Sequence, residues 1–597
     1  MKQITEMKCS IKLAKLLFTL LLIISTNFLP LRGQEVNSIK TARRVADKIL
    51  HDAKFQYNLT LAGKEHNGNV ETIDFTRNYC SNGVAYALSS IHSDFDKEIE
   101  LELGHTRALK IFVNDVEIYN ATGQKEIDAR KFVERNLVLP LKIKIPVKAG
   151  FNKVLFKSLS PEVGSWRIFL RTKESCFSLL TFPQISINIA QFTNFLMLGV
   201  FPESTYSTFG EMEQKFNIGK IFNVGGQKTA WIVPRPELVV ENAEVHQPWG
   251  EGYTAFNYHA GGVAWAVCTL GDYLNHAPYK DYIKNYCDFY IEKRPYLAYQ
   301  KYQLNLFNGY DNRAVESYLL DFTSAPLLPF VHLLIGGSKN AGYTELFAEI
   351  KDYVLHRQTR TEKGNFCRIT PKPLTVWTDD MYMGIPFLVQ AARLAKTEKE
   401  KADLLNDAVS QIFAFNSYVF DTSDCLYQHA QYLSGTIKQP YWSRANGWAL
   451  WAVTHTLSFL PKGHPKYKAL LEHYKCHVNS LLKYQDTSGL WHNVVNEPKS
   501  YLETSGSAIF AACIATGINK GWLQKSKYQQ PLLNAWKGIE SQIEADGTVS
   551  NICIGTMCST DLNDYMKRPV CNNDTHGLFP IIFAAIEIDK MLNIKTK

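Results

Sequence analysis

The sequence predicts a protein with two folded parts, an N-terminal β-sandwich of the jelly-roll type followed by an (α/α)6 toroid. Two patterns indicate this: apolar residues alternate with polar ones between about residues 55 and 170, whereas from residue 258 onwards they recur every three or four positions. A chain of 597 residues is also too long for one compact core. The predicted fold class is therefore multidomain, with β and α structure in separate domains.

The alternating part consists of short runs that are separated by turn sequences such as Asn114-Asp115 and Ala149-Gly150. Period-two patterning of this kind is typical of a half-buried antiparallel sheet. We therefore expect the sandwich within residues 34–185. The clearest strands are residues 98–103, 109–113, 142–147, 153–157 and 166–170.

Part of this region is similar to a known carbohydrate-associated module. The succession of residues 111–119, 148–154 and 166–170 resembles the galactose-binding-like jelly-roll modules that are attached to many glycosidases. The resemblance implies a module that either binds sugar or has only a structural role, and the sequence leaves both alternatives open.

Residues 186–225 form a predicted linker, and the helical domain is expected to occupy residues 226–597. The loops between its helical stretches contain Gly, Pro, Asn and Asp. Repeated helical hairpins can close into a ring. Eleven helices are recognisable, which leaves one helix of the toroid unassigned; they are residues 258–273, 279–292, 314–334, 343–356, 381–395, 399–415, 447–459, 465–484, 506–518, 530–543 and 578–592.

The first 33 residues have the layout of a secretory signal peptide. Four lysines precede an apolar run at residues 16–31, and small or polar residues follow it. This segment carries about half of the net charge of +8, so no nucleic-acid partner is expected. An uncleaved membrane anchor is the alternative. We expect a secreted or periplasmic protein with no membrane contact after cleavage of the leader.

Apart from Cys9, the eleven cysteines are scattered between Cys80 and Cys571, without a C-x-x-C pair or the spacing of zinc ligands. One disulfide is conceivable in an exported protein. Most of these cysteines, however, lie in apolar helical patterns and are expected to be buried. We predict no metal, no cofactor and no redox chemistry.

Two motifs rich in charged and aromatic residues lie where apolar helical patterns begin. Tryptophan packs against the flat C–H faces of a sugar ring, and charged groups bind its hydroxyl or carboxylate groups. A carbohydrate site on a helical scaffold is therefore expected at these two motifs, which are Trp377-Thr378-Asp379-Asp380-Met381-Tyr382-Met383 and Trp442-Ser443-Arg444-Ala445-Asn446-Gly447-Trp448.

Together with residues 426–429, 484–492 and 501–508, these motifs resemble glycoside hydrolase family 105, the unsaturated rhamnogalacturonyl hydrolases, and its relative family 88, the unsaturated glucuronyl hydrolases. The resemblance implies removal of an unsaturated uronic acid from the non-reducing end of oligosaccharides that lyases release from pectin, rhamnogalacturonan or a similar acidic polysaccharide. In these families water is added across the C4=C5 double bond, and the resulting hemiketal breaks down.

The resemblance assigns the catalytic role to Asp379, which would protonate C4 and then, as a carboxylate, assist water at C5. Such a group needs a raised pKa, which a partly dry, aromatic site would supply. Asp321 matches the second active-site aspartate of the family, and we expect it to hold ring hydroxyls and to raise the pKa of Asp379. His429 matches the histidine that donates to substrate or water.

Three further side chains complete the predicted substrate site. Arg444 would face the uronate carboxylate, while Trp442 and Trp448 would stack on the ring or wall it. Structural alternatives exist for most of these residues: a helix cap for Asp379, a paired core carboxylate for Asp321, an ion pair at a helix end for Arg444, and the core for Trp448.

Other polar residues near the motifs are interpreted as structural. Asp380 is the better candidate for capping the helix that begins at Met381, so it is not part of the predicted catalytic set. Glu503 is interpreted as the cap of the helix at residue 506, and His492 and His576 as hydrogen-bonding loop residues.

The chain also departs from the family pattern. Ala445 stands where the family usually has glycine, and His429 is followed by Ala430-Gln431-Tyr432 where the family usually has an acid. These changes concern the sugar next to the uronate. Two alternative functions remain, a toroid glycosidase or lyase that acts on a saturated substrate and a non-catalytic carbohydrate-binding protein, and the sequence does not indicate the oligomeric state.

Overall fold

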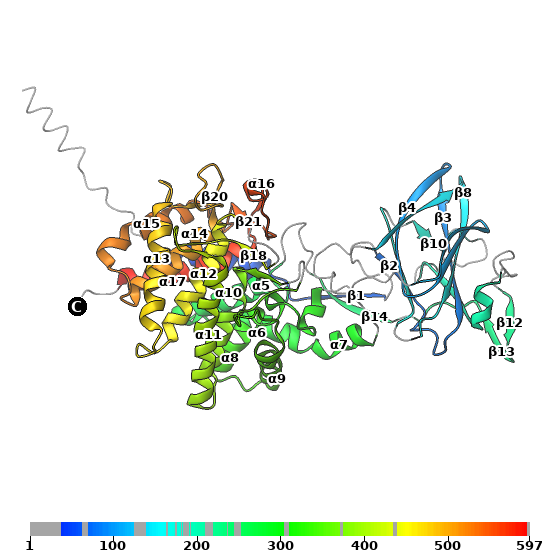
Figure 1. Ribbon diagram of the computed structural model, residues 1–597, viewed down its shortest axis with the longest axis horizontal. Coiled ribbons are helices and arrows are strands. Elements are labelled where there is room, and N and C mark those ends of the chain that lie inside the picture. Colours follow the sequence, from blue (N-terminus) through cyan, green and yellow to red (C-terminus); the bar gives the residue numbers. More distant parts are fainter. Residues whose placement is uncertain are drawn as a thin grey trace, which may run out of the picture.

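The β-strands and the helices gather in two parts at opposite ends of the molecule (Figure 1), as the sequence predicted. In the part of the chain that the structure describes, no helix combines the length and the apolar character needed to cross a membrane. The predicted signal peptide, residues 1–33, lies outside the described residues. The computed structural model describes residues 37–61, 70–123, 139–162, 165–173, 176–180, 182, 190, 193–208, 219–235, 237–243, 252–303, 310–369, 374–433 and 439–593.

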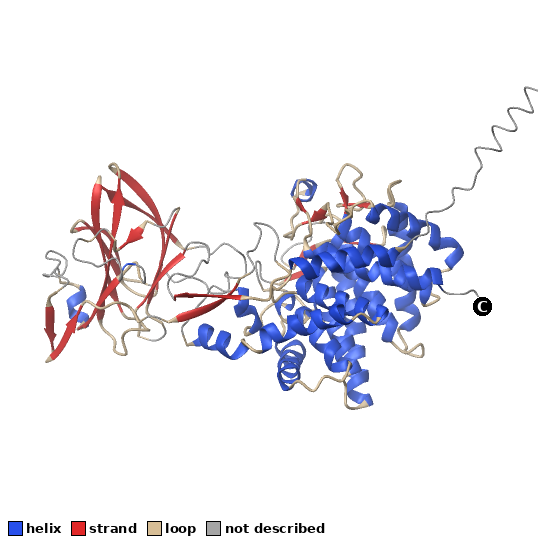
Figure 2. Cartoon of the chain, turned by 180° about the vertical axis from the view of Figure 1, so that it is seen from behind, coloured by secondary structure: helices blue, strands red, loops and turns tan. Residues whose placement is uncertain are grey.

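Two antiparallel sheets form the N-terminal β-sandwich (red strands at one end of Figure 2). One sheet has the strand order β2-β9-β4-β7 and the other β10-β3-β8-β5-β6, with β11 also paired to β3. Alternate apolar residues of both sheets meet between them and form the core. The strands are β2 (Val70–Asp74), β3 (Val84–Ser93), β4 (Lys97–His105), β5 (Leu109–Val113), β6 (Val116–Ala121), β7 (Leu141–Val147), β8 (Gly150–Leu159), β9 (Arg167–Thr172), β10 (Phe177–Ser178) and β11 (Leu196–Phe201).

The outer face of the second sheet is also covered. Tyr86 and Leu88 of β3 pack with Leu198 of β11 in a second apolar cluster. β11 lies in the segment that was predicted to be a linker, residues 186–225. The sandwich therefore continues past residue 185, because β11 pairs with β3 within the second sheet, while side chains such as Leu179 and Phe182 pack on its outer face.

A two-stranded ladder joins the sandwich to the helical domain. β1 (Tyr57–Leu61) leads into the sandwich and pairs antiparallel with β14 (Leu238–Asn242), which leads out of it. The side-chain amide of Gln300 bonds both backbone groups of Val240, at 2.6 and 3.1 Å. The entry and the exit of the sandwich are therefore adjacent and are attached to a helix of the other domain.

The helical domain is a closed double ring, in which each inner helix packs against its inner neighbours and against one outer helix. The inner helices are apolar on nearly all sides because they are covered all round. In ring order they are α5 (Tyr258–Leu274), α8 (Leu328–Ile335), α10 (Asp379–Arg393), α12 (Ser443–Phe459), α14 (Thr504–Asn519) and α17 (Thr575–Asn593), and their outer partners are α6 (Ala277–Ile291), α9 (Ala341–Asp352), α11 (Glu398–Val419), α13 (Tyr467–Lys483), α15 (Lys525–Glu540) and α2 (Ser38–Asp52).

The helix that the sequence analysis left unassigned is α2, at the start of the described chain. Its apolar face, which includes Ala42, Val45 and Ile49, packs into the core of the ring beside α17. The Ser38 hydroxyl donates to the carbonyl oxygen of Ala585 at 2.9 Å. The predicted sandwich boundary at residue 34 therefore differs from the structure, because the ring takes its last outer helix from before the sandwich.

The stretch predicted as one helix over residues 314–334 is broken. Only α8 is α-helical, and it is preceded by two short 3-10 turns, Leu320–Phe322 and Ala325–Leu327. Pro326 and Pro329 lack the N–H donors that a continuous helix would need there. The break places Asp321 on an irregular segment at the end of the ring.

Gly447, within the second motif, is required for close packing of two inner helices. A Cβ atom at this position would lie 2.9 Å from Cδ1 of Ile509 on α14. This glycine therefore fixes the distance between α12 and α14, and its role is structural.

Candidate active site

The N-terminal ends of the inner helices meet at one end of the ring, and both sequence motifs lie there. Contacts run from helix to helix around this end: Arg444 of α12 donates to the Ser505 hydroxyl of α14 at 3.1 Å, and His576 of α17 bonds the Tyr258 hydroxyl of α5 at 2.5 Å. Helix N-termini present unpaired N–H groups and a partial positive charge. This end of the ring is therefore suited to an anionic ligand.

Asp379 and His429 face each other at this end. The short strand β15 (Thr375–Trp377) pairs with β18 (Ala430–Tyr432), and the Thr378 N–H donates to the His429 carbonyl oxygen at 2.9 Å. Nε2 of His429 lies 3.2 Å from Oδ2 of Asp379. Both side chains are buried, at 0% and 7% exposure, and neither of these two atoms has a hydrogen-bond partner among the described residues.

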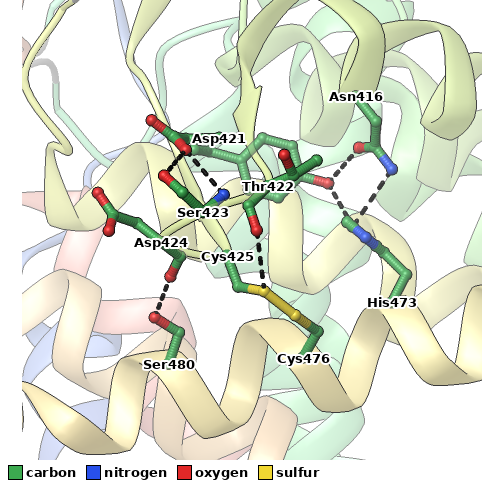
Figure 3. Close-up of a disulfide and its surroundings, with 10 residues drawn as sticks. Asn416, Asp421, Thr422, Ser423, Asp424, Cys425, His473, Cys476 and Ser480 are labelled. Carbon is green, nitrogen blue, oxygen red and sulfur yellow. Dashed lines mark hydrogen bonds between the residues drawn. A yellow bond between two sulfur atoms is a disulfide. The ribbon is translucent and has the colours of Figure 1, made fainter.

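A disulfide anchors the hairpin that leads to His429 (Figure 3). The hairpin consists of β16 (Phe420–Asp421) and β17 (Leu426–Tyr427), and Cys425 in its turn is bonded to Cys476 of α13. The Ser480 hydroxyl, one turn further along α13, donates to the Asp424 carbonyl oxygen. The sequence analysis allowed one disulfide but did not identify this pair, which is brought together only by the tertiary fold.

Arg368 is the main side chain at the site that the sequence analysis missed. Its guanidinium group donates to both carboxylate oxygens of Asp380 at 2.8 to 3.1 Å and to Asp321 at 2.8 and 3.3 Å. It also packs on the Trp377 ring at 4.3 Å. Arg368 lies in a short irregular segment without periodicity, so no local pattern indicated its role.

Asp380 belongs to this cluster and does not cap its helix. α10 begins at Asp379, two residues earlier than predicted. Its N-cap is Thr378, whose side chain makes no capping hydrogen bond. The capping interpretation of Asp380 is therefore wrong. Its carboxylate is needed to balance the buried charge of Arg368.

The electrostatics of the three carboxylates differ from the prediction. Burial favours a raised pKa for Asp379, but His429, Arg368 and Arg444 outweigh it and lower the pKa below the usual value. Burial raises the pKa of Asp321 despite the charge of Arg368, and the charge of Asp379 adds to the rise. The expected raised pKa of Asp379 is therefore wrong in this structure, because the expectation omitted the cations.

Burial also raises the pKa of Asp380, to about 6, although Arg368 opposes the change. Asp321 and Asp379 add to the rise by like-charge repulsion. Two carboxylates thus share one guanidinium group, with the charge of Asp379 nearby, and the cluster can hold a proton.

Arg444 is fully buried, and its terminal nitrogens already have partners. They donate to the carbonyl oxygens of Cys553 and Ile554, the latter at 2.7 Å, in addition to the Ser505 hydroxyl. The guanidinium group lies 4.5 Å from the Trp442 ring centre. The structure therefore places Arg444 behind Trp442, in contrast to the predicted direct contact with a carboxylate.

The two predicted tryptophans lie at different depths. The Trp442 indole packs 4.6 Å from the His429 ring, and its N–H donates to the Asn493 side-chain oxygen at 3.0 Å. Trp448 lies one turn deeper, against Tyr382 and Phe579 at ring distances of 4.5 and 5.9 Å. Trp442 is thus a direct neighbour of the Asp379–His429 pair, whereas Trp448 lies in the core of the ring.

The comparison with protein families agrees with this geometry. The profile of the family described as Glycosyl Hydrolase Family 88 matches residues 231–592, which is most of the helical ring. This chain belongs to that family. The family assignment confirms the predicted relationship to families 105 and 88, and it makes the protein a glycosidase.

Characterised relatives of this family 88 chain match only parts of it. The Unsaturated rhamnogalacturonyl hydrolase YesR of Bacillus subtilis is 30% identical over 253 residues, which are 40% of this chain and 68% of that protein. An Unsaturated 3S-rhamnoglycuronyl hydrolase of Formosa agariphila is 26% identical over 246 residues, or 37% of this chain and 62% of that protein. A solved glycoside hydrolase from family 105 of C. acetobutylicum is similar with a TM-score of 0.48 and 23% identity, over 56% of this chain and 95% of that chain.

Two further predictions about this family 88 site can be compared with the structure. Glu503 is the N-cap of α14 and accepts hydrogen bonds from the N–H groups of Ser505 and Gly506 at 2.9 and 2.7 Å, which confirms its structural role. His576 was interpreted as a loop residue, but it lies in the first turn of α17 between Asp574 and Tyr258. Burial lowers the pKa of His576 to about 4.

Possible metal ligands gather at the opposite end of the ring. Among the described residues, the ligand atoms of Cys268, Asp272 and His332 lie within 4.8 Å of one another. Asp272 is bonded to His332 at 3.3 Å and lies 3.8 Å from the ammonium group of Lys280. Ion pairing accounts for this arrangement, so it provides no reason to assign a metal.

Proposed function

We propose that this family 88 protein removes an unsaturated uronic acid from the non-reducing end of oligosaccharides that lyases generate. The observation that carries the proposal is the pair formed by Oδ2 of Asp379 and Nε2 of His429, 3.2 Å apart and buried. Apart from this contact with each other, the two atoms have no hydrogen-bond partner among the described residues, and buried polar atoms are normally completed by a ligand or water. In this proposal the unsaturated ring supplies the further partner.

In the proposed reaction Asp379 delivers a proton to C4, and water adds to C5 with help from the resulting carboxylate. The C5 hemiketal then opens to a ketone, and the neighbouring sugar leaves with its hydroxyl group. The pKa of Asp379 is low before substrate binds. A bound uronate brings a like charge close to it, which raises the pKa of Asp379 and favours the protonated form.

The neighbouring groups have supporting roles in this proposal. His429 donates to the substrate or to the attacking water, and Asp321 holds ring hydroxyls from its position on Arg368. Trp442 forms the wall beside His429. Arg444 contributes its positive charge from behind Trp442, together with the N-terminal ends of the inner helices.

We propose an oligosaccharide of rhamnogalacturonan or a similar pectic polymer as the substrate class. The name of one relative, an unsaturated rhamnogalacturonyl hydrolase, supports this class, and that of the other, an unsaturated 3S-rhamnoglycuronyl hydrolase, supports a rhamnose-containing acidic polymer more generally. We also propose that the protein acts in the periplasm or outside the cell. The leader-like residues 1–33 and the Cys425–Cys476 disulfide support an oxidising compartment.

The test is the ultraviolet absorbance of the conjugated uronate during incubation with lyase digests of rhamnogalacturonan, homogalacturonan and glycosaminoglycans. The parent protein should remove the absorbance from a pectic digest, and Asp379→Asn should not. Asp403→Asn, an exposed acid on α11 that pairs with Lys399, serves as the matched control and should retain full turnover.

Each other outcome has a defined meaning. Loss of absorbance only with a glycosaminoglycan digest would overturn the substrate class and keep the reaction. Turnover of saturated glycosides without any loss of absorbance would replace the reaction by ordinary glycoside hydrolysis. Binding without turnover by the parent protein would favour the non-catalytic alternative.

A further inference from the structure

Tyr565 contacts the edge of the His429 ring that is directed away from Asp379. Its hydroxyl lies 2.7 Å from Nδ1 of His429. It belongs to α16 (Leu562–Met566), which interrupts the connection between β21 (Ile552–Cys553) and β22 (Val570–Cys571). The Tyr565 ring is buried against Trp442, and its carbonyl oxygen accepts from the Asn493 side chain at 2.9 Å. Its position is therefore fixed by packing and by a backbone contact.

The hydrogen bonds around Tyr565 determine where its own hydrogen points. The Ser559 N–H donates to the Tyr565 oxygen at 3.0 Å. Burial raises the pKa of Tyr565 far above its usual value, so the hydroxyl keeps its hydrogen. Among the described residues, the acceptor within reach of this hydrogen is Nδ1 of His429.

We infer that Tyr565 is a positioning residue that holds His429 in the tautomer with its hydrogen on Nε2, the nitrogen that faces Asp379. A neutral imidazole has one donor and one acceptor nitrogen, and the partner of one nitrogen decides the role of the other. With Nδ1 accepting from Tyr565, Nε2 carries the hydrogen. The inference rests on the proposed function, in which His429 donates to substrate or water.

The opposite tautomer would place a lone pair of Nε2 opposite the Asp379 carboxylate. Those two groups would repel each other at 3.2 Å, and His429 would have no hydrogen to offer to a ligand. The other groups that surround His429 are the Trp377 and Trp442 rings, with Arg444 behind Trp442 and Arg368 behind Trp377. Tyr565 at Nδ1 and Asp379 at Nε2 therefore act on opposite ring nitrogens and favour the same tautomer.

The first test is Tyr565→Phe, which removes the hydroxyl and keeps the ring that packs on Trp442. We expect kcat to fall by about 10-fold with little change in KM, because the tautomer is then favoured by Asp379 alone. Ser559→Ala is the matched control, because it removes the hydroxyl contacts with Asp564 and with the Asp561 N–H and keeps the N–H that Tyr565 uses.

A double-mutant cycle separates an effect through His429 from a packing effect. In the His429→Gln background, Tyr565→Phe should have no further effect on kcat. An undiminished 10-fold loss in that background would overturn the inference, as would a Tyr565→Phe variant with the kcat of the parent.

Nitrogen-15 NMR of histidine-labelled protein tests the tautomer without any substrate. The His429 signals, identified by their absence in His429→Gln, should show a protonated Nε2 and an unprotonated Nδ1 in the parent, and a mixture in Tyr565→Phe. A protonated Nδ1 in the parent would overturn the inference directly. If the tautomer is as expected but no digest is turned over, the proposed function fails and the role of Tyr565 as a positioning residue of His429 remains.

Discussion

The two ends of the inner helices differ in how many buried charged side chains they carry. At the N-terminal end, Arg368 and Arg444 are buried and charged. Arg368 is paired with Asp321 and Asp380, and the buried Asp379 lies close by. Desolvation of so many charges is costly, even when they are paired. A ring that only had to be stable would not need this cluster.

At the C-terminal end, the same helices carry neutral or exposed polar groups. Burial lowers the pKa of His455 to about 3, so it is neutral and bonds Gln390 at 2.7 Å. Arg393 lies over the Phe459 ring, and Asp272 is exposed to solvent. Among these groups, the buried charges therefore lie at the N-terminal end of the inner helices, where a ligand is expected.

The largest expected difference between the two ends is in stability. Arg368→Met leaves two buried carboxylates without their cation, and we expect the free energy of unfolding to fall by about 3–5 kcal/mol. Arg393→Met is the matched change at the other end, where the loss should stay below about 1 kcal/mol. Urea unfolding of the helical domain, followed by tryptophan fluorescence, measures both values. Equal losses at the two ends would contradict the comparison.

Removal of the disulfide should have the next largest effect. The double variant Cys425→Ser/Cys476→Ser should lose about 2–4 kcal/mol of stability, because the loop between the two cysteines is no longer closed. Its kcat should also fall, since the hairpin that carries His429 is less firmly held. Cys80→Ser, which removes an exposed free thiol in the sandwich, is the control and should change neither quantity.

The charge cluster should also be visible in the pH dependence of stability. The folded-state pKa of Asp380 is raised to about 6, above the unfolded value of 3.8, so the folded state binds the proton more tightly. Its contribution is therefore complete below about pH 4 and is lost as the pH rises through about 6. Relative to Asp380→Asn, the free energy of unfolding of the parent should fall by on the order of 2 kcal/mol over this pH range. A difference in the free energy of unfolding between the two proteins that stays constant from pH 4 to 7 would show that Asp380 is ionised throughout.

The smallest effect is expected for Asp272→Asn at the C-terminal end. This acid is 53% exposed in its side chain and pairs with His332 and Lys280. Pairs of this kind contribute little, so stability should change by less than about 0.5 kcal/mol and turnover of the pectic digest should not change. A loss of activity would show that the C-terminal end also serves the reaction.

The sequence predicted most of the fold because each domain has its own period. Helix α2 shows the limit of this reasoning. Its apolar residues Ala42, Val45, Ala46 and Ile49 follow helical spacing, but they precede the strands. Nothing in that short segment indicates that its partner is α17, at the other end of the chain. The spacing of apolar residues identifies a helix or a strand, whereas long-range packing decides the domain to which that helix or strand belongs.

The site was predicted in part, for a similar reason. Asp379, His429, Asp321 and Trp442 lie together, as the order of their motifs predicted, while their roles stay a prediction. Arg368 was missed because its segment has no pattern. The predicted pKa of Asp379 was wrong because His429 lowers it, with smaller contributions from Arg368 and Arg444, and together they outweigh burial. Charges that reach a site from an irregular segment are visible only after folding.

The place of α2 in the ring has a consequence for how the chain can be divided. The sandwich is an insertion within the helical domain, since the ring begins before it and closes after it, and β1 and β14 lie side by side where the insertion starts and ends. Cutting the chain after the sandwich would remove α2 and uncover the apolar side of α17. Excising the sandwich between Tyr57 and Asn242, with a short turn to rejoin the two ends, would instead preserve every helix of the ring.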